Sequence, residues 1–139
     1  MLKIYSDGGS RGNPGPSAFA VVVCRHGEIV STHSRFIGTG TNNSAEYKGL
    51  IHAIGHAVDS GENDIEFFMD SKLVINQMKG VYKVRSKDLM PLYRDARALA
   101  SLIRHVRFTH VRRTDPMIAV ADSLVNKKLD EHAVRRTAL

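Results

Sequence analysis

The apolar side chains of this chain change their spacing once, near residue 45, and that change limits the folds open to it. Before it, residues 2–6, 18–25 and 29–37 are rich in β-branched and aromatic side chains, which favours strands. From residue 45 to Gly61, apolar residues recur every three or four positions, as on one face of a helix. The pattern predicts an antiparallel meander of three strands followed by a helix.

Strands and helices alternate in the remaining sequence. We expect a fourth strand at 65–69, a short helix that Gly80 stops, a third helix over 89–99, a fifth strand at 105–111 and a last helix after Pro116. This βββαβααβα order predicts an α/β protein with a five-stranded mixed sheet and helices on both faces. The length of 139 residues and the absence of linkers predict a single domain, 1–139.

The charge of the chain is basic and uneven. The formal net charge is +6, and residues 79–139 hold 14 Lys and Arg against 6 Asp and Glu, whereas residues 1–78 hold 6 against 8. A basic half attracts polyanions such as nucleic acid, although a merely solvated basic surface has the same composition.

Nothing in the sequence indicates a membrane or secreted protein. No apolar run approaches the roughly 20 residues of a membrane span, and the N-terminus lacks the features of a signal peptide. The single cysteine, Cys24, lies in an apolar run, where it is expected to be a small buried hydrophobe. We therefore expect a cytoplasmic protein without disulfides.

Four carboxylates occupy positions where solubility does not require a charge. Asp7 and Asp70 close predicted strands, Glu46 lies in the first turn of a helix, and Asp122 lies on the apolar side of the last helix. Local roles exist for three of them, in a turn, a helix cap and a capping box that begins at Asn43. If they converged, they would repel one another unless cations held them, so the pattern predicts a divalent metal site.

Four motifs along the chain carry a resemblance. These are DGGSRGNPGP, which begins at Asp7; TNNSAE, which ends at Glu46; the strand ending at Asp70 with SKLVINQ; and VADSLVNKKLD around Asp122. In this order they resemble the type 1 ribonuclease H family over nearly the whole chain. The resemblance implies the ribonuclease H-like fold and an endonuclease that hydrolyses the RNA strand of RNA/DNA hybrids, leaving 5′-phosphate and 3′-hydroxyl ends.

The resemblance also implies a cofactor and substrate contacts. Asp7, Glu46, Asp70 and Asp122 would be the catalytic residues and would hold two Mg²⁺ ions, for which Mn²⁺ could substitute. The hybrid would be the partner of a monomer that needs no other protein. Gly8, Gly9 and Ser10 would read the 2′-hydroxyl, with the amides of the two glycines left uncovered by other groups. Further polar contacts to the substrate would come from Asn13, Thr41, Asn42, Asn43 and Ser71.

Three features depart from the family pattern. Arg112, followed by Arg113, stands where many members have a loop histidine, so these arginines are expected either to act on the phosphate or product, or to be only a solvated basic loop. The chain also lacks a Trp-rich basic protrusion and a hybrid-binding domain, as in a compact branch of the family. A short basic loop would take over part of that role, with weaker and more salt-sensitive binding. Its basic residues are Lys79, Lys83, Arg85 and Lys87.

Other functions are open on the sequence alone. A binding module with purely structural acids is disfavoured because all four acids are present. An aspartyl-phosphate phosphatase with Asp7 as nucleophile would need a second Asp where Gly9 stands. A junction resolvase of the same architecture is disfavoured by the TNNSAE segment. His52 and His56 have the spacing of a zinc-binding pair, but no further ligand is evident nearby, so zinc is not predicted.

Overall fold

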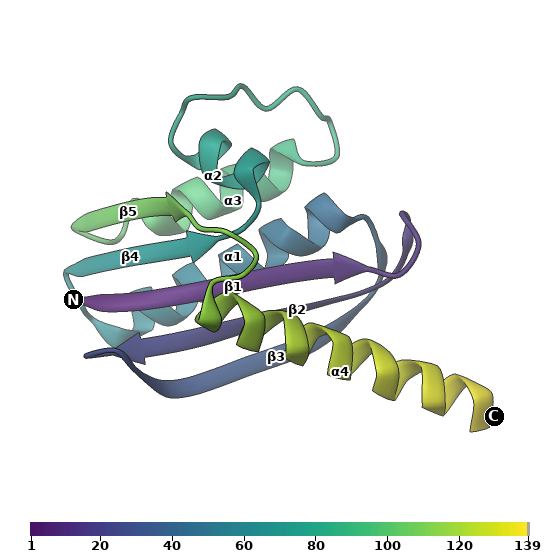
Figure 1. Ribbon diagram of the computed structural model, residues 1–139. Coiled ribbons are helices and arrows are strands. Elements are labelled where there is room, and N and C mark those ends of the chain that lie inside the picture. Colours follow the sequence, from purple (N-terminus) through teal and green to yellow (C-terminus); the bar gives the residue numbers. More distant parts are fainter. Residues whose placement is uncertain (139) are drawn as a thin grey trace.

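A computed structural model describes residues 1–138 (Figure 1). Within these residues five strands and four helices follow the predicted order, βββαβααβα. The elements are β1 (Leu2–Ser10), β2 (Gly15–Arg25), β3 (Glu28–Gly40), α1 (Asn42–Ser60), β4 (Asp64–Met69), α2 (Lys72–Met78), α3 (Met90–Ala100), β5 (His105–His110) and α4 (Pro116–Ala138).

The sheet has the strand order β3-β2-β1-β4-β5. The pairs β1·β2 and β2·β3 are antiparallel, whereas β1·β4 and β4·β5 are parallel. Parallel neighbours need a crossover connection, which α1 provides before β4 and the pair α2 and α3 provides before β5. The predicted five-stranded mixed sheet is confirmed.

The two faces of the sheet bury different cores, because alternate residues of a strand point to opposite sides. On one face, strand residues such as Ile4 and Val21 pack beneath α1, α2 and α3 in the larger core. On the other, Ala20 and Val22 pack with Val125 of α4 in a smaller one. Figure 1 shows α4 on one side of the sheet and α1 on the other. Among the described residues, no helix is long and apolar enough to cross a membrane.

The first hairpin is longer and more regular than predicted. β1 continues through the glycines to Ser10, with Gly8 opposite Phe19 and Gly9 opposite Ala18, so only residues 11–14 form the turn. The predicted strands, 2–6 and 18–25, were therefore too short at this hairpin, because a paired neighbouring strand outweighs the weak strand preference of glycine. Asp7 therefore lies inside a strand and not in a turn.

Parallel pairing of β1 with β4 sets the position of two acids. The pairing runs as far as Tyr5 opposite Phe68, after which β4 ends and β1 continues. Two residues further along the same register, Asp7 comes beside Asp70. Because β4 ends before β1 does, the last residues of β1 have no neighbouring strand on that side. The carboxyl ends of strands are positions where α/β proteins bind ligands.

The start of α1 differs from the predicted capping box. Thr41 is the N-cap, and the backbone N–H of Ser44 donates to Thr41 Oγ1 at 3.1 Å while Ser44 Oγ accepts from the Thr41 N–H at 3.0 Å. The box predicted between Asn43 and Glu46 was wrong, because a box two residues earlier already satisfies the helix end. Glu46 is consequently left without a capping role.

Candidate metal centre

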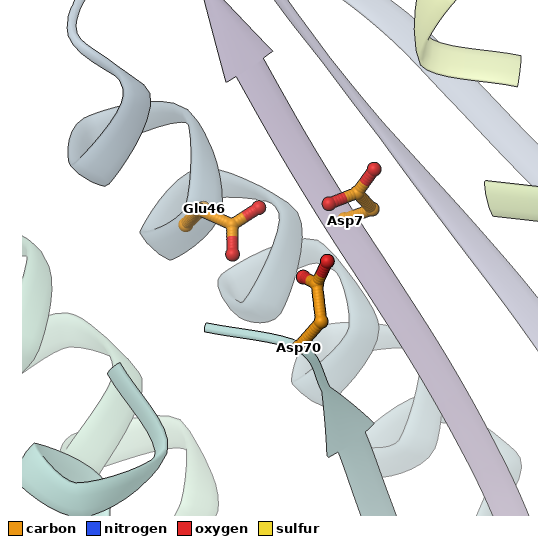
Figure 2. A group of neighbouring side chains, drawn as sticks. All are labelled: Asp7, Glu46 and Asp70. Atoms are coloured by element: carbon orange, nitrogen blue, oxygen red, sulfur yellow. The ribbon is translucent and has the colours of Figure 1, made fainter. Parts of the chain in front are cut away.

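Three of the four predicted acids meet at one point. Asp7, Glu46 and Asp70 each place a carboxylate oxygen within 4.8 Å of the others. In Figure 2 their carboxylates point toward one another from β1, from α1 and from the end of β4. An all-oxygen set of this kind suits hard divalent ions such as Mg²⁺ or Mn²⁺.

Glycines let α1 approach β1 closely enough to deliver Glu46. A Cβ at Gly8 would lie 2.3 Å from the backbone carbon of Ala45, which no real contact allows. A Cβ at Gly49 would lie 3.1 Å from Phe19 Cβ and 3.2 Å from the Asp7 carbonyl oxygen. The helix backbone therefore lies directly on the strand, and glycine is required at this contact because it has no side chain.

Beyond the end of β4, two backbone N–H groups of β1 have no strand partner on that side, and side chains of α1 accept their hydrogen bonds. The Gly8 N–H donates to Glu46 Oε1, and the Ser10 N–H donates to Asn42 Oδ1 at 2.8 Å. The expectation that Gly8 has an uncovered amide was therefore wrong. Beyond β4, α1 replaces that strand as the hydrogen-bonding partner of β1. The bond from Gly8 to Glu46 also fixes the Glu46 carboxylate beside Asp7.

Burial makes the charges of the acid cluster costly. The pKa of Asp7 is raised to about 7, chiefly by burial and in addition by the charges of Asp70 and Asp122. Burial, then the charge of Asp7, raises the pKa of Glu46 well above its ordinary value. Burial also raises the pKa of Asp70, and the Arg113 guanidinium offsets part of this rise. The cluster thus has an uncompensated negative charge that a bound cation would relieve.

Asp122 shares the cavity of the other three acids but stands apart from them. It lies on α4, is half-buried, and is not among the three acids whose oxygens lie within 4.8 Å of one another. It lines a cavity of about 420 Å³ together with Asp7, Glu46 and Asp70. The Asn126 side-chain amide donates to Asp122 Oδ2 at 3.4 Å. All four predicted acids therefore face one cavity, three of them in close contact.

The structure separates the two loop arginines. Arg113 lines the acid cavity, whereas Arg112 is exposed and does not line it. Arg11 and Asn126, which were not predicted, line the cavity as well. His110, whose charge acts on Asp70, was also not predicted. Only Asn126 carried a sequence signal, since it follows Asp122 by four residues on a helix and so lies on the same side.

The predicted substrate contacts divide between two neighbouring hollows. Gly8, Gly9, Ser10, Asn42 and Ser71 line the acid cavity. A cleft of about 500 Å³ lies beside it and takes in Asn13, Thr41, Lys83 and Arg85. Asn43 lines both. Neither hollow is lined by Lys79 or Lys87.

Comparison with known proteins gives a family model and full-length structural matches. The model of a family described as reverse transcriptase-like matches residues 5–128, a span that includes all four acids. The bifunctional protein Rv2228c of Mycobacterium tuberculosis is 43% identical over 132 residues, which are 94% of this chain and 36% of that protein. The ribonuclease HI of Halobacterium salinarum is 42% identical over 128 residues, 91% of this chain and 63% of that protein.

Solved structures of relatives superpose closely. The N-terminal ribonuclease H domain of Rv2228c, solved as a fusion protein, has a TM-score of 0.89 at 41% identity, covering 99% of this chain and 98% of that one. LC11-RNase H1, solved in complex with an RNA/DNA hybrid, has a TM-score of 0.89 at 35% identity, covering 96% and 99%. This chain thus spans about a third of the mycobacterial protein but nearly all of two solved domains.

Proposed function

The chain belongs to the type 1 ribonuclease H family, and from that premise we propose that it is an endonuclease that hydrolyses the RNA strand of RNA/DNA hybrids. The products would carry 5′-phosphate and 3′-hydroxyl ends. One observation carries the proposal, which is the convergence of Asp7, Glu46 and Asp70 within 4.8 Å inside a cavity that Asp122 also lines. A metal-dependent nuclease needs such a set, because a phosphodiester anion repels its attacking nucleophile.

The proposed cofactor is a pair of Mg²⁺ ions, for which Mn²⁺ could substitute. The donor set fits them, since it consists of carboxylates whose burial favours a bound cation. Bound divalent ions would polarise the scissile phosphate and lower the pKa of water. Asp7 would contact both ions, Glu46 and Asp70 would complete one site, and Asp122 would hold the other. The Gly8 amide and Asn126 would orient two of these carboxylates.

The two hollows support a proposal for how a duplex lies on the protein. The RNA strand would cross the acid cavity, with Gly9 and Ser10 against the sugar edge that carries the 2′-hydroxyl. The DNA strand would follow the neighbouring cleft, where Lys83 and Arg85 can contact phosphates. Asn43 would stand between the strands, because it lines both hollows. Arg113 would contact the phosphate at the acid cavity.

Three further expectations stay proposals. They are that residues 1–139 form one domain, that the protein acts as a monomer, and that it acts in the cytoplasm. Sedimentation of the purified chain with and without hybrid would test the oligomeric state.

The experiment that tests the function is cleavage of an end-labelled panel by the metal-stripped chain after addition of Mg²⁺ or Mn²⁺. The panel holds an RNA/DNA hybrid, an RNA duplex, a DNA duplex and a DNA duplex with one ribonucleotide. We expect hybrid cleavage within the RNA strand and none in EDTA. Products with 2′,3′-cyclic phosphate ends, or no hybrid cleavage at high enzyme with either metal, would overturn the proposal.

A further inference from the structure

Three histidines from two elements gather between β3 and α1. The ring centroid of His33, on β3, lies 5.7 Å from that of His52 and 5.0 Å from that of His56, both on α1. The sequence supplied only the pair on the helix, and the fold brings the third imidazole to it. The question is what three clustered imidazoles can bind.

Sheet register and helix spacing together aim these rings at one another. His33 stands opposite Val21 of β2, and cross-strand partners share a face of the sheet. Val21 belongs to the core beneath α1, so His33 faces the same helix. His52 and His56 are four residues apart on α1 and therefore lie on one side of it, about 6 Å apart at Cβ.

The observed spacing matches that of imidazoles around one metal ion. With a Zn–N distance of about 2.0–2.1 Å and tetrahedral angles, ring centroids lie about 5 Å apart. The ring centroids of His33 and His56 lie 5.0 Å apart and those of His33 and His52 5.7 Å apart, which is close to that value. The ring nitrogens themselves do not yet converge, since within residues 1–138 only the acid cluster has its ligand atoms within 4.8 Å of one another. Binding requires the half-buried rings to rotate about χ2.

The chemical state of the rings favours a metal over a proton. Burial lowers the pKa of His33 and of His52, so both rings are neutral at pH 7 and keep a lone pair for a metal. No carboxylate among the described residues forms an ion pair with any of the three. Ser31 Oγ lies 3.4 Å from His33 Nε2, a contact of the kind that fixes the tautomer and orientation of a metal-bound ring.

We propose that His33, His52 and His56 form a site for one divalent transition-metal ion of the kind that imidazole prefers, with Zn²⁺ as its probe. A fourth position would stay open to water, because three protein ligands do not close a tetrahedral shell. The charge of Arg35 acts on His52, and its guanidinium lies 5.9 Å from the Phe19 ring centroid. Its positive charge weakens the site.

The site is separate from the acid cluster and does not rest on the proposed nuclease function. His52 and His56 follow Glu46 on α1 by six and ten residues, which is about 9 and 15 Å along the helix axis. Its occupant would join the edge strand β3 to α1, the helix that carries Glu46. The expected consequence is structural, a gain in thermal stability on metal binding.

Thermal unfolding and Co²⁺ absorption test the proposal on the whole chain in excess Mg²⁺, which keeps the acid cluster occupied. Zn²⁺ at a hundredfold excess over its Kd should raise Tm by about 5 °C or more. Co²⁺ should give the visible absorption of a tetrahedral complex, which Zn²⁺ then removes at one equivalent. His33→Gln and His56→Ala should each weaken Zn²⁺ binding at least about tenfold, since even outer-shell partners contribute that much. Arg35→Gln should strengthen it.

Matched controls make the test decisive. His26→Ala and His105→Ala remove exposed histidines elsewhere and should leave the Zn²⁺ effect unchanged. The Tm of every variant is first measured without transition metals, so a folding defect is seen directly. If Zn²⁺ still raises the Tm of His33→Gln, the three-ligand site is wrong, because His52 and His56 on the helix would then be sufficient. Equal binding by His56→Ala and the parent chain, or no Zn²⁺ shift at all, would overturn it entirely.

Discussion

The acid cavity has two halves that are held in different ways. Asp7, Glu46 and Asp70 come from the central strands and from α1, which pack through the larger core, and Gly8 ties two of them together by a backbone hydrogen bond. Asp122 comes from α4, which alone covers the other face through a smaller core of mainly small side chains. The difference teaches that a single cavity can combine a tightly constrained part with one whose geometry depends on the docking of a single helix.

The largest expected effect is on the constrained half. Asp7→Asn keeps the side-chain shape but removes a central charge of the proposed metal site, so hybrid cleavage should fall at least about a thousandfold. Hybrid binding should persist, because Asn removes a phosphate-repelling charge. Single-turnover cleavage and a binding isotherm measure the two. Asp64→Asn, at the opposite end of β4, is the control and should cleave normally; near-normal rates for Asp7→Asn would remove the basis of the metal-site assignment.

The second-largest effect is expected at the contact between β1 and α1, which brings Glu46 beside Asp7. Gly8→Ala would place a Cβ 2.3 Å from the Ala45 backbone carbon, so α1 must move off β1. We expect a loss of about 3 kcal/mol in unfolding free energy together with most of the activity. Gly55→Ala on the same helix is the control, since its Cβ meets nothing within 4 Å and should stabilise the helix slightly. Urea unfolding of both variants decides, and equal stabilities would contradict the close-contact argument.

A smaller effect is expected in the half held by α4. Asp122→Asn should reduce cleavage about 10- to 100-fold, because one ligand of one ion changes while the three-acid cluster is intact. Raising the Mg²⁺ concentration should recover part of the rate, which it should not do for Asp7→Asn. Glu131→Gln, at an exposed carboxylate of the same helix that does not line the acid cavity, controls for a general change in α4. A loss as large as that of Asp7→Asn, without recovery by Mg²⁺, would remove the distinction between the halves.

The smallest effect is a pH dependence of stability. The folded-state pKa of Asp7, about 7, lies above its ordinary value of 3.8, so the folded state binds this proton more tightly than the unfolded state. Stability of the metal-free protein should therefore fall as the pH rises from about 4 to about 7, and this carboxyl alone contributes at most about 1.4 kcal/mol per pH unit. Mg²⁺ should remove most of this slope. Asp7→Asn should remove only part of it, because the pKa values of Glu46 and Asp70 are also raised. Denaturant unfolding in EDTA at several pH values measures it, and a slope of opposite sign would contradict the burial argument.

Much of the fold could be read from the sequence because the hydrophobic periods are strong. The order of elements and the mixed sheet are as predicted. The local rules misjudged the first hairpin and the start of α1, since strand pairing outweighed glycine and Thr41 capped the helix before Asn43 could. For the hairpin, the deciding contact was made by a neighbouring strand outside the window that a local rule considers. For α1, two local capping boxes were possible in the sequence, and the structure forms the earlier one.

The features of the candidate site were likewise predictable from the sequence only in part. Acids could be found because a charge in an apolar context is visible in sequence. The Gly8 amide bond and the meeting of His33 with the α1 histidines could not, because each joins residues that only the crossing of α1 over the sheet brings together. Contacts of that kind need a register and a helix position, and neither is encoded within a few residues.

The chain order of the four acids has a consequence for synthesis. Positions 7, 46 and 70 leave the ribosome well before position 122, because α4 follows all five strands in chain order. A nascent chain that has emerged only as far as β5 holds every strand of the sheet and three of the four acids, but it has no fourth. The cavity can therefore be completed only after the synthesis of the sheet has ended.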